Sequence, residues 1–213
     1  ITVEQDYVIR IPDEIPFEKA APLLCAGITL YSPLKRWGAG PGKKVAIIGM
    51  GGLGHVGVQI AAKMGAEVVV ISQTMSKKDD GLRFGASDYY ATSEPERLRE
   101  LRGSLDLMVS TVAAVADLDA MLKLLKPGGV LVDVGLPEHA STLRLSSLTN
   151  GNKVLAGSQI GGIAETQEVL DFCAANGVVP QVEIITGEDI TAAYDKVVHS
   201  QVRYRYVIDT STF

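Results

Sequence analysis

The chain has only two cysteines and no apolar run close to the roughly 20 residues that a membrane-spanning helix needs. Cys25 and Cys173 lie too far apart to suggest a disulfide framework, so we expect a reducing, cytoplasmic location. Basic residues are not in excess, because 20 Lys and Arg are interspersed with 25 Asp and Glu. The composition therefore argues against nucleic acid and membrane as partners.

The N-terminus lacks the basic segment and apolar stretch of a signal peptide. It also lacks an initiating Met. We expect that the chain begins inside a longer natural protein, although processing would leave the same mark.

Glycine, in contrast, is abundant, and Gly49, Gly51 and Gly54 have the spacing G-x-G-x-x-G. An apolar run at 44–48 precedes them, and a helical pattern of small residues follows. In this context Gly49 allows a tight turn, Gly51 lets a pyrophosphate approach the backbone, and Gly54 lets the helix pack on the strand. A purely structural turn is the alternative. A second predicted strand at 67–72 favours a dinucleotide site, where the helix N-terminus binds the anion.

Hydroxyl-bearing and basic residues follow that second strand, in the order Ser72-Gln73-Thr74 and then Ser76-Lys77-Lys78. Sites for the unphosphorylated cofactor usually place Asp or Glu here, whereas hydroxyl and ammonium groups suit a 2′-phosphate. The alternative is a solvated helix cap, because Ser76 and Asp79 have capping-box spacing. A helix that begins at Ser76 would turn Asp79 and Asp80 away. The pattern predicts NADP.

Strand and helix patterns then alternate along the chain. Since parallel strands need crossover connections, this alternation predicts an α/β fold with a doubly wound parallel (Rossmann) sheet. The expected strands are 88–90, 105–110, 130–135 and 153–158, and the expected helices are 94–102, 116–125, 165–176 and 188–199. Ligands of such sheets lie beyond the carboxyl ends of the strands. The residues at those ends are Thr111, Val112, Gly135, Leu136, Ser158 and Ile160.

The two ends of the chain fit this alternation less well. Residues 1–18 have an extended pattern, and 22–31 predicts a buried apolar helix. The last strand, 202–209, has no neighbouring partner in the sequence. We expect it to pair outside the nucleotide sheet, with residues 1–11 as a candidate partner.

Three segments, 21–34, 41–55 and 202–209, together resemble zinc-type medium-chain alcohol dehydrogenases. The similarity is to the NADP-using, cinnamyl-alcohol-dehydrogenase-like branch. It implies an oxidoreductase that transfers a hydride between the nicotinamide and a small primary alcohol or aldehyde, and it implies a homodimer that pairs along the sixth strand. It also implies three regions: a catalytic-domain remnant (1–28), a dinucleotide-binding domain (29–165) and a return to the catalytic domain (166–213).

The resemblance also assigns site residues. It places Ser72, Gln73, Thr74 and Lys77 at the 2′-phosphate and Arg203 near the pyrophosphate. The nicotinamide half would contact Thr29, Thr111, Val134, Gly135, Ser158 and Ile160. The glycine-turn residues Gly49, Gly51, Gly52, Leu53 and Gly54 and the strand-end residues Val112 and Leu136 complete the expected cofactor site.

Zinc chemistry is represented by one residue, since the resemblance makes Cys25 the third ligand of the family's catalytic zinc. The chain has neither C-x-x-C nor H-x-x-x-H, and its histidines are scattered, so the other ligands are missing. Within this chain we expect Cys25 to be a small buried residue, and Cys173 to pack in a helix. His55 could lean on the cofactor, but a surface helix position is the more frequent outcome.

Two functions therefore stay open. The first is the NADP-dependent dehydrogenase of the parent protein, with zinc as its metal. The second is a fragment that binds NADP(H) without catalysis. A methyltransferase, which also uses a glycine turn, is disfavoured because no acidic residue ends the second strand.

Overall fold

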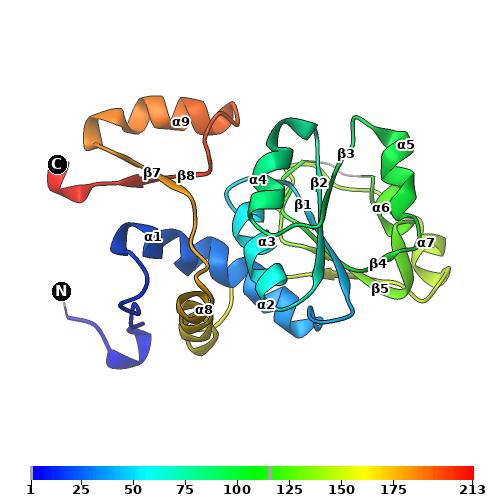
Figure 1. Cartoon of the computed structure of the whole chain (residues 1–213), viewed down its shortest axis with the longest axis horizontal. Coiled ribbons are helices and arrows are strands. Elements are labelled where there is room, and N and C mark those ends of the chain that lie inside the picture. Colours follow the sequence, from blue (N-terminus) through cyan, green and yellow to red (C-terminus); the bar gives the residue numbers. More distant parts are fainter. Residues whose placement is uncertain (1, 115–116) are drawn as a thin grey trace.

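The computed structural model describes residues 2–114 and 117–213 and contains a six-stranded, fully parallel sheet. Its strand order is β3-β2-β1-β4-β5-β6, which is that of a doubly wound Rossmann fold, so the predicted fold class is confirmed. Figure 1 shows this sheet with its helices on the right. The strands are β1 (Lys44–Ile48), β2 (Glu67–Ser72), β3 (Asp88–Ala91), β4 (Leu105–Ser110), β5 (Leu125–Asp133) and β6 (Val154–Gly157).

The central strands are apolar on both faces because helices cover both sides of the sheet. Along β1, Val45 and Ile47 face one core while Ala46 and Ile48 face the other, and all four are almost fully buried. The first core includes α2 (Ile28–Arg36), α3 (Gly54–Lys63) and α8 (Ile163–Asn176). The second includes α6 (Leu118–Leu122). The remaining short helices of this part are α4 (Lys78–Arg83), α5 (Pro95–Leu98) and α7 (Ser146–Thr149).

Several predicted elements differ in extent from the observed ones. The predicted helix 94–102 is divided into α5 and a 3₁₀ turn at Arg99–Leu101. The predicted helix 116–125 is shorter, since β5 already begins at Leu125; its expected first residue, 116, lies outside the described residues. The apolar segment 22–31 is also interrupted. There α1 (Phe17–Pro22) is followed by a π-helical turn at Leu23–Gly27 and then by α2, and Pro22 has no N–H to continue a regular helix.

The C-terminal segment forms a second, two-stranded sheet. The last strand, β8 (Arg205–Ile208), pairs in parallel with β7 (Val182–Ile185), and α9 (Ile190–Val198) is the crossover between them. The expectation that this strand pairs outside the nucleotide sheet is confirmed. The prediction that residues 1–11 are its partner is wrong, because its partner is β7. Within residues 2–11, the part of that segment that the structure describes, there is only a 3₁₀ turn at Gln5–Tyr7. Figure 1 shows β7, β8 and α9 at the upper left, away from the large sheet.

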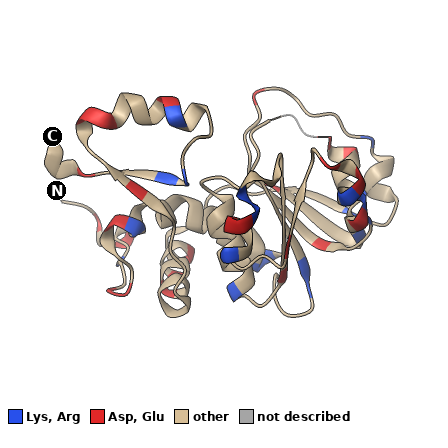
Figure 2. Ribbon diagram, turned by 45° about the horizontal axis from the view of Figure 1, so that its top comes forward, with Lys and Arg blue, Asp and Glu red and all other residues tan. Residues whose placement is uncertain are grey.

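Acidic and basic residues are interspersed along the ribbon in both parts of the molecule, as Figure 2 shows. No helix among the described residues is long and apolar enough to cross a bilayer.

Candidate cofactor site

The glycine turn follows β1 directly, and the structure gives each glycine of the motif a different physical role. Gly49 has φ +94°, and a Cβ there would lie 2.5 Å from Thr111 Oγ1. A Cβ on Gly54 would lie 1.8 Å from the Gly49 carbonyl oxygen, so only glycine lets α3 begin this close to the strand. Gly51 has no heavy atom within 4 Å of its Cβ position. The backbone at Gly51 is therefore open to a ligand.

This turn lies where the strand order reverses. β1 pairs with β2 on one side and with β4 on the other, and the crevice of a doubly wound sheet forms at that point. Thr111, directly after β4, donates from its hydroxyl to the Ile48 carbonyl at 2.9 Å. The next strand end is close as well, since a Cβ on Gly135 would lie 2.1 Å from the Val112 carbonyl oxygen. The structure thus brings Gly49, Thr111, Val112 and Gly135 together.

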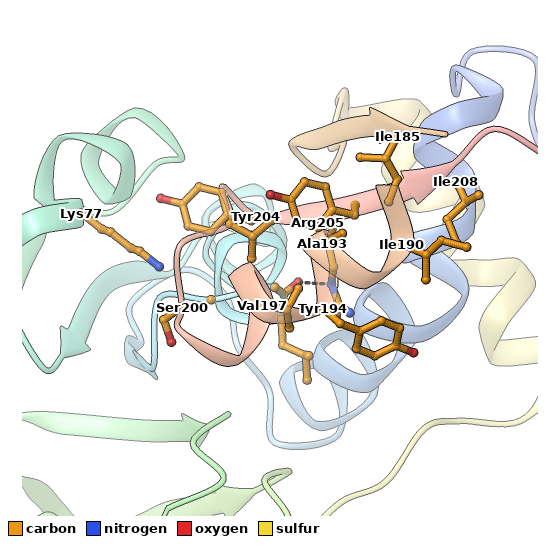
Figure 3. Close-up of a pocket in the computed structure, with 15 residues that line it drawn as sticks. Lys77, Ile185, Ile190, Ala193, Tyr194, Val197, Ser200, Tyr204, Arg205 and Ile208 are labelled. Atoms are coloured by element: carbon orange, nitrogen blue, oxygen red, sulfur yellow. Dashed lines mark hydrogen bonds between the residues drawn. The ribbon is translucent and has the colours of Figure 1, made fainter. Parts of the chain in front are cut away.

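Arg205, on β8, lies against the glycine turn, which the sequence did not predict. Its Nε donates to the Gly52 carbonyl at 3.1 Å, a bond marked by a dashed line in Figure 3. The guanidinium of Arg203, for which the pyrophosphate was expected, instead pairs with Asp80 at 2.7 Å. The structure therefore places Arg205, not Arg203, against the glycine turn. The alternation of large and basic residues in this strand was the signal, but choosing between the two arginines required the path of the chain into β8.

Lys77 approaches the same turn from the other side. It belongs to a 3₁₀ turn, Met75–Lys77, and its Nζ donates to the Met50 carbonyl at 3.0 Å. The ammonium also lies over the Tyr204 ring, 5.1 Å from its centroid. Burial, followed by the nearby charge of Arg203, lowers the pKa of Lys77.

The polar residues after β2 are held by a cap that differs from the expected one. Thr74 Oγ1 accepts from the Ser76 backbone N–H at 3.4 Å, so Thr74 caps the 3₁₀ turn and Ser76 does not begin a capping box. Ser72 ends β2 and is half-buried, and the residues that follow it, Gln73 and Thr74, are exposed.

Asp80 lies behind this segment and faces the C-terminal strand. Its carboxylate accepts hydrogen bonds from Arg83, Arg203 and the Tyr204 hydroxyl. Burial alone would raise the pKa of Asp80, but the bonds from Tyr204 and Arg83 hold it below its ordinary value. The carboxylate is thus neutralised by protein groups.

His55, the second residue of α3, is fully buried, so both sequence expectations for it are wrong. Its Nδ1 lies 3.0 Å from the Gly51 carbonyl oxygen, and its Nε2 accepts from the Gln181 N–H at 3.1 Å. Burial lowers the pKa of His55 to about 4. The imidazole supports the turn from behind.

A cleft of about 420 Å³ runs between the glycine turn and the C-terminal segment. Figure 3 shows Lys77 and Arg205 on its walls, with the apolar residues Val197 and Ile190 of α9. Two cations and the open glycine backbone thus line one space, an arrangement that suits an anion next to an apolar surface.

The residues expected around the nicotinamide are less uniformly placed. Thr29 is buried on α2, and the Gly135 N–H donates to Asp133 Oδ1 at 3.2 Å just after Val134. Leu136 and Ile160 are largely exposed, whereas Ser158 is half-buried. A Cβ on Gly161 would lie 2.6 Å from the Ile28 side chain, which shows that the segment after β6 runs beside the start of α2.

Comparison with known protein families identifies the family of this chain. Residues 52–175, more than half of the chain, match the model of the zinc-binding dehydrogenase family. The chain belongs to the zinc-binding dehydrogenases. The match begins inside the glycine turn and ends in α8.

Relatives of this zinc-binding dehydrogenase extend the match to both ends of the chain. The NADP-dependent alcohol dehydrogenase C 1 of Mycolicibacterium smegmatis is 58% identical over 212 residues, which are 100% of this chain and 61% of the relative. Cinnamyl alcohol dehydrogenase 2 of Arabidopsis thaliana is 43% identical over 99% of this chain and 57% of its own length. The chain therefore spans about three fifths of the curated relatives it matches.

Solved structures agree with this match. A cinnamyl alcohol dehydrogenase from Sorghum bicolor superposes with a TM-score of 0.95 at 37% identity, over 98% of this chain and 60% of that one. The Helicobacter pylori cinnamyl alcohol dehydrogenase complexed with NADP(H) has a TM-score of 0.89 at 42% identity, over 98% and 60% of the two chains.

The metal ligands of a zinc-binding dehydrogenase are not assembled by these residues alone. Cys25 lies in the π-helical turn and is exposed, so its expected burial is wrong. Within residues 2–114 and 117–213, no three His, Cys, Asp or Glu side chains are grouped to hold a metal. A tetrahedral zinc site with three protein ligands does not fit this set. Cys173, in contrast, is fully buried in α8 as predicted, and burial raises the pKa of its thiol to about 12.

Proposed function

We propose that this chain binds NADP(H) across the carboxyl edge of its six-stranded sheet. The observation that carries the proposal is the pair of cations on the glycine turn. Lys77 Nζ donates to the Met50 carbonyl and Arg205 Nε donates to the Gly52 carbonyl, so two positive charges flank the open backbone of Gly51. A pyrophosphate is the dinucleotide group that such a site suits.

The selectivity for the 2′-phosphate comes from the end of β2. Ser72 stands where a carboxylate would bind an unphosphorylated ribose, and Thr74 and Lys77 follow in the capped 3₁₀ turn. Asp80 does not oppose a phosphate strongly, because Arg203, Arg83 and Tyr204 already hold its carboxylate. The curated relative from Mycolicibacterium smegmatis, which is named as NADP-dependent, supports this choice of cofactor.

We propose that the protein reduces a small aldehyde, or oxidises the matching primary alcohol, with the nicotinamide supplying or accepting the hydride when it is bound. Thr111, Val112 and Gly135 at the ends of β4 and β5 would orient the nicotinamide half, with Thr29, Val134, Leu136, Ser158 and Ile160 around it. Residues 1–28 and 166–213 would belong to a catalytic domain and 29–165 to the dinucleotide-binding domain. Two free thiols fit a cytoplasmic location.

A second candidate is binding of NADP(H) without catalysis. The observation that favours it for this chain is Cys25, which has no companion ligands among the described residues. The two functions share the cofactor site. They are separated by whether the chain oxidises NADPH in the presence of an aldehyde.

A homodimer is a further part of the proposal. β6 pairs with β5 on one side, and its residues Val154 to Ala156 are only half-buried. A second copy could extend the sheet along this edge. Sedimentation velocity should give a dimer mass, and replacing Leu155 with Lys should give a monomer. A wild-type chain that sediments as a monomer at tens of micromolar would refute the dimer.

The cofactor is tested by titrating the chain with NADPH and NADH, and then repeating the titrations with Ser72→Asp. We expect the wild type to prefer NADPH, and the variant to lose that preference by about 10- to 100-fold, because the new carboxylate repels the 2′-phosphate. Ser146→Asp, on exposed α7, adds the same charge and should leave both affinities unchanged. Unchanged discrimination in Ser72→Asp would remove the role given to Ser72.

A further inference from the structure

His55 connects two parts of the chain that are far apart in sequence. On one side, the Gly51 carbonyl accepts from both the His55 backbone N–H at 3.2 Å and the imidazole Nδ1 at 3.0 Å. On the other side, Nε2 accepts from the backbone N–H of Gln181, just before β7. These partners require a proton on Nδ1 and a lone pair on Nε2, which assigns the tautomer.

The bond to Gly51 orients a peptide group of the glycine turn. In a trans peptide the carbonyl of one residue and the N–H of the next point in opposite directions. Holding the Gly51 oxygen on the imidazole therefore directs the Gly52 N–H away from His55. Gly51 and Gly52 both line the cleft, and no backbone carbonyl in the described part of the chain accepts from this N–H.

The imidazole also holds the strand that carries Arg205. The Tyr204 ring stacks on it, with centroids 4.7 Å apart and planes inclined by 13°, and Phe84 closes the cluster at 5.7 Å from both rings. The Tyr204 N–H in turn donates to the Gln181 carbonyl at 3.3 Å. Since Arg205 directly follows Tyr204, the position of its guanidinium on Gly52 depends on this stack.

We propose that His55 is a positioning residue of the cofactor site, which aligns the Gly52 N–H and the Arg205 guanidinium on one anion without touching it. This role rests on the proposed binding of NADP(H). The imidazole bonds to the Gly51 carbonyl through Nδ1 and stacks on the ring that precedes Arg205. Its effect is therefore specific to the pyrophosphate, which NADPH and NADH share, and it does not extend to the 2′-phosphate.

The test uses the 213-residue chain with His55→Phe and His55→Asn. Phenylalanine keeps a ring against Tyr204 but loses both hydrogen bonds, whereas asparagine keeps a donor in the place of Nδ1–H. Dissociation constants are measured for NADPH, NADH and adenosine 2′-monophosphate, which has no pyrophosphate. For His55→Phe we expect both dinucleotides to weaken by the same factor, about 10-fold, with adenosine 2′-monophosphate within about twofold of wild type. His55→Asn should restore part of the loss.

A destabilised core is the competing explanation, and Leu170→Ala provides its control. Leu170 is fully buried on α8, a helix that contributes no residue to the turn, so this variant should unfold more easily and still bind NADPH with wild-type affinity. The positioning role would be overturned if His55→Phe lost affinity for all three ligands equally. It would also be overturned if both His55 variants bound NADPH and NADH with wild-type affinity. If the wild-type chain itself fails to bind NADPH, the proposed function fails first, and that result is separate from the two above.

Discussion

Two glycine substitutions in the same turn should have opposite effects on the free energy of unfolding, and the stabilising one should weaken cofactor binding. At Gly51 a methyl group meets no atom within 4 Å and the backbone φ is not positive, so Gly51→Ala fits the folded chain. Alanine restricts the unfolded chain, which should raise the free energy of unfolding by about 0.4–1 kcal/mol. The same methyl group would stand where the pyrophosphate approaches the backbone. We expect the dissociation constant of NADPH to rise at least about 10-fold.

At Gly54 the new methyl group would lie 1.8 Å from the Gly49 carbonyl oxygen and 2.9 Å from its carbon. Both are backbone atoms between β1 and α3, so the turn itself must open. Overpacking of this kind lowers the free energy of unfolding by about 1–3 kcal/mol. Because the atoms in the way belong to the backbone, we expect Gly54→Ala to lie at or above the upper end of that range.

Urea unfolding and NADPH titration of the two variants, with Gly40→Ala as the control, measure both effects. Gly40 lies before β1, at the opposite end of the strand, and its Cβ would meet the nearest atom at an ordinary 3.6 Å. The reasoning is refuted if Gly51→Ala binds NADPH like the wild type, or if Gly54→Ala unfolds at the wild-type urea concentration.

Three other predictions follow from the site. The pKa of His55 is about 4 in the folded chain and 6.5 in its ordinary state, so the unfolded chain binds more protons between these pH values. The free energy of unfolding should therefore fall by about 3 kcal/mol as the pH drops from 6.5 to 4. Urea unfolding at a series of pH values measures this fall, and His55→Asn should reduce it. In fluorescence titrations, Arg205→Met should weaken the binding of NADPH and NADH alike by about 10-fold. Arg99→Met, which removes an exposed ion pair with Glu96, should change neither affinity. A change in the ratio of the NADPH and NADH affinities in Arg205→Met would place Arg205 at the 2′-phosphate instead. The isolated chain should bind NADPH but not oxidise it with cinnamaldehyde, even with zinc supplied, because Cys25 has no companion ligands among the described residues. A steady loss of NADPH absorbance in the presence of cinnamaldehyde would contradict this prediction.

The large sheet and its glycine turn were predictable because their causes are local. Residues 45–48 are buried on both faces of the sheet, as a continuous hydrophobic stretch requires. Gly49 is needed because of its own positive φ, and Gly54 because a Cβ there would meet the nearby Gly49 carbonyl. The burial of Cys173 followed from helical spacing in the same way.

Cys25 shows why local reasoning fails at the edge of the nucleotide domain. Its neighbours in the sequence are apolar, and a cysteine among them is usually buried. In the structure a π-helical turn, with Leu23 and Ala26 facing inward, leaves the Cys25 side chain exposed. The exposure depends on how the turn packs on α8, which no pattern within the segment records.

The structure of the glycine turn depends both on local sequence and on tertiary packing. The order of strand, turn and helix around Gly51 is determined by the sequence alone, since β-branched residues, glycines and small helical residues each favour one local conformation. Which side chains face that turn was decided only by the tertiary structure. The parallel pairing of β8 with β7 brings Arg205 to Gly52, and the same path buries His55 under Tyr204. These contacts join residues more than 100 positions apart, so their register is set by packing between segments rather than by any property that the segments have separately.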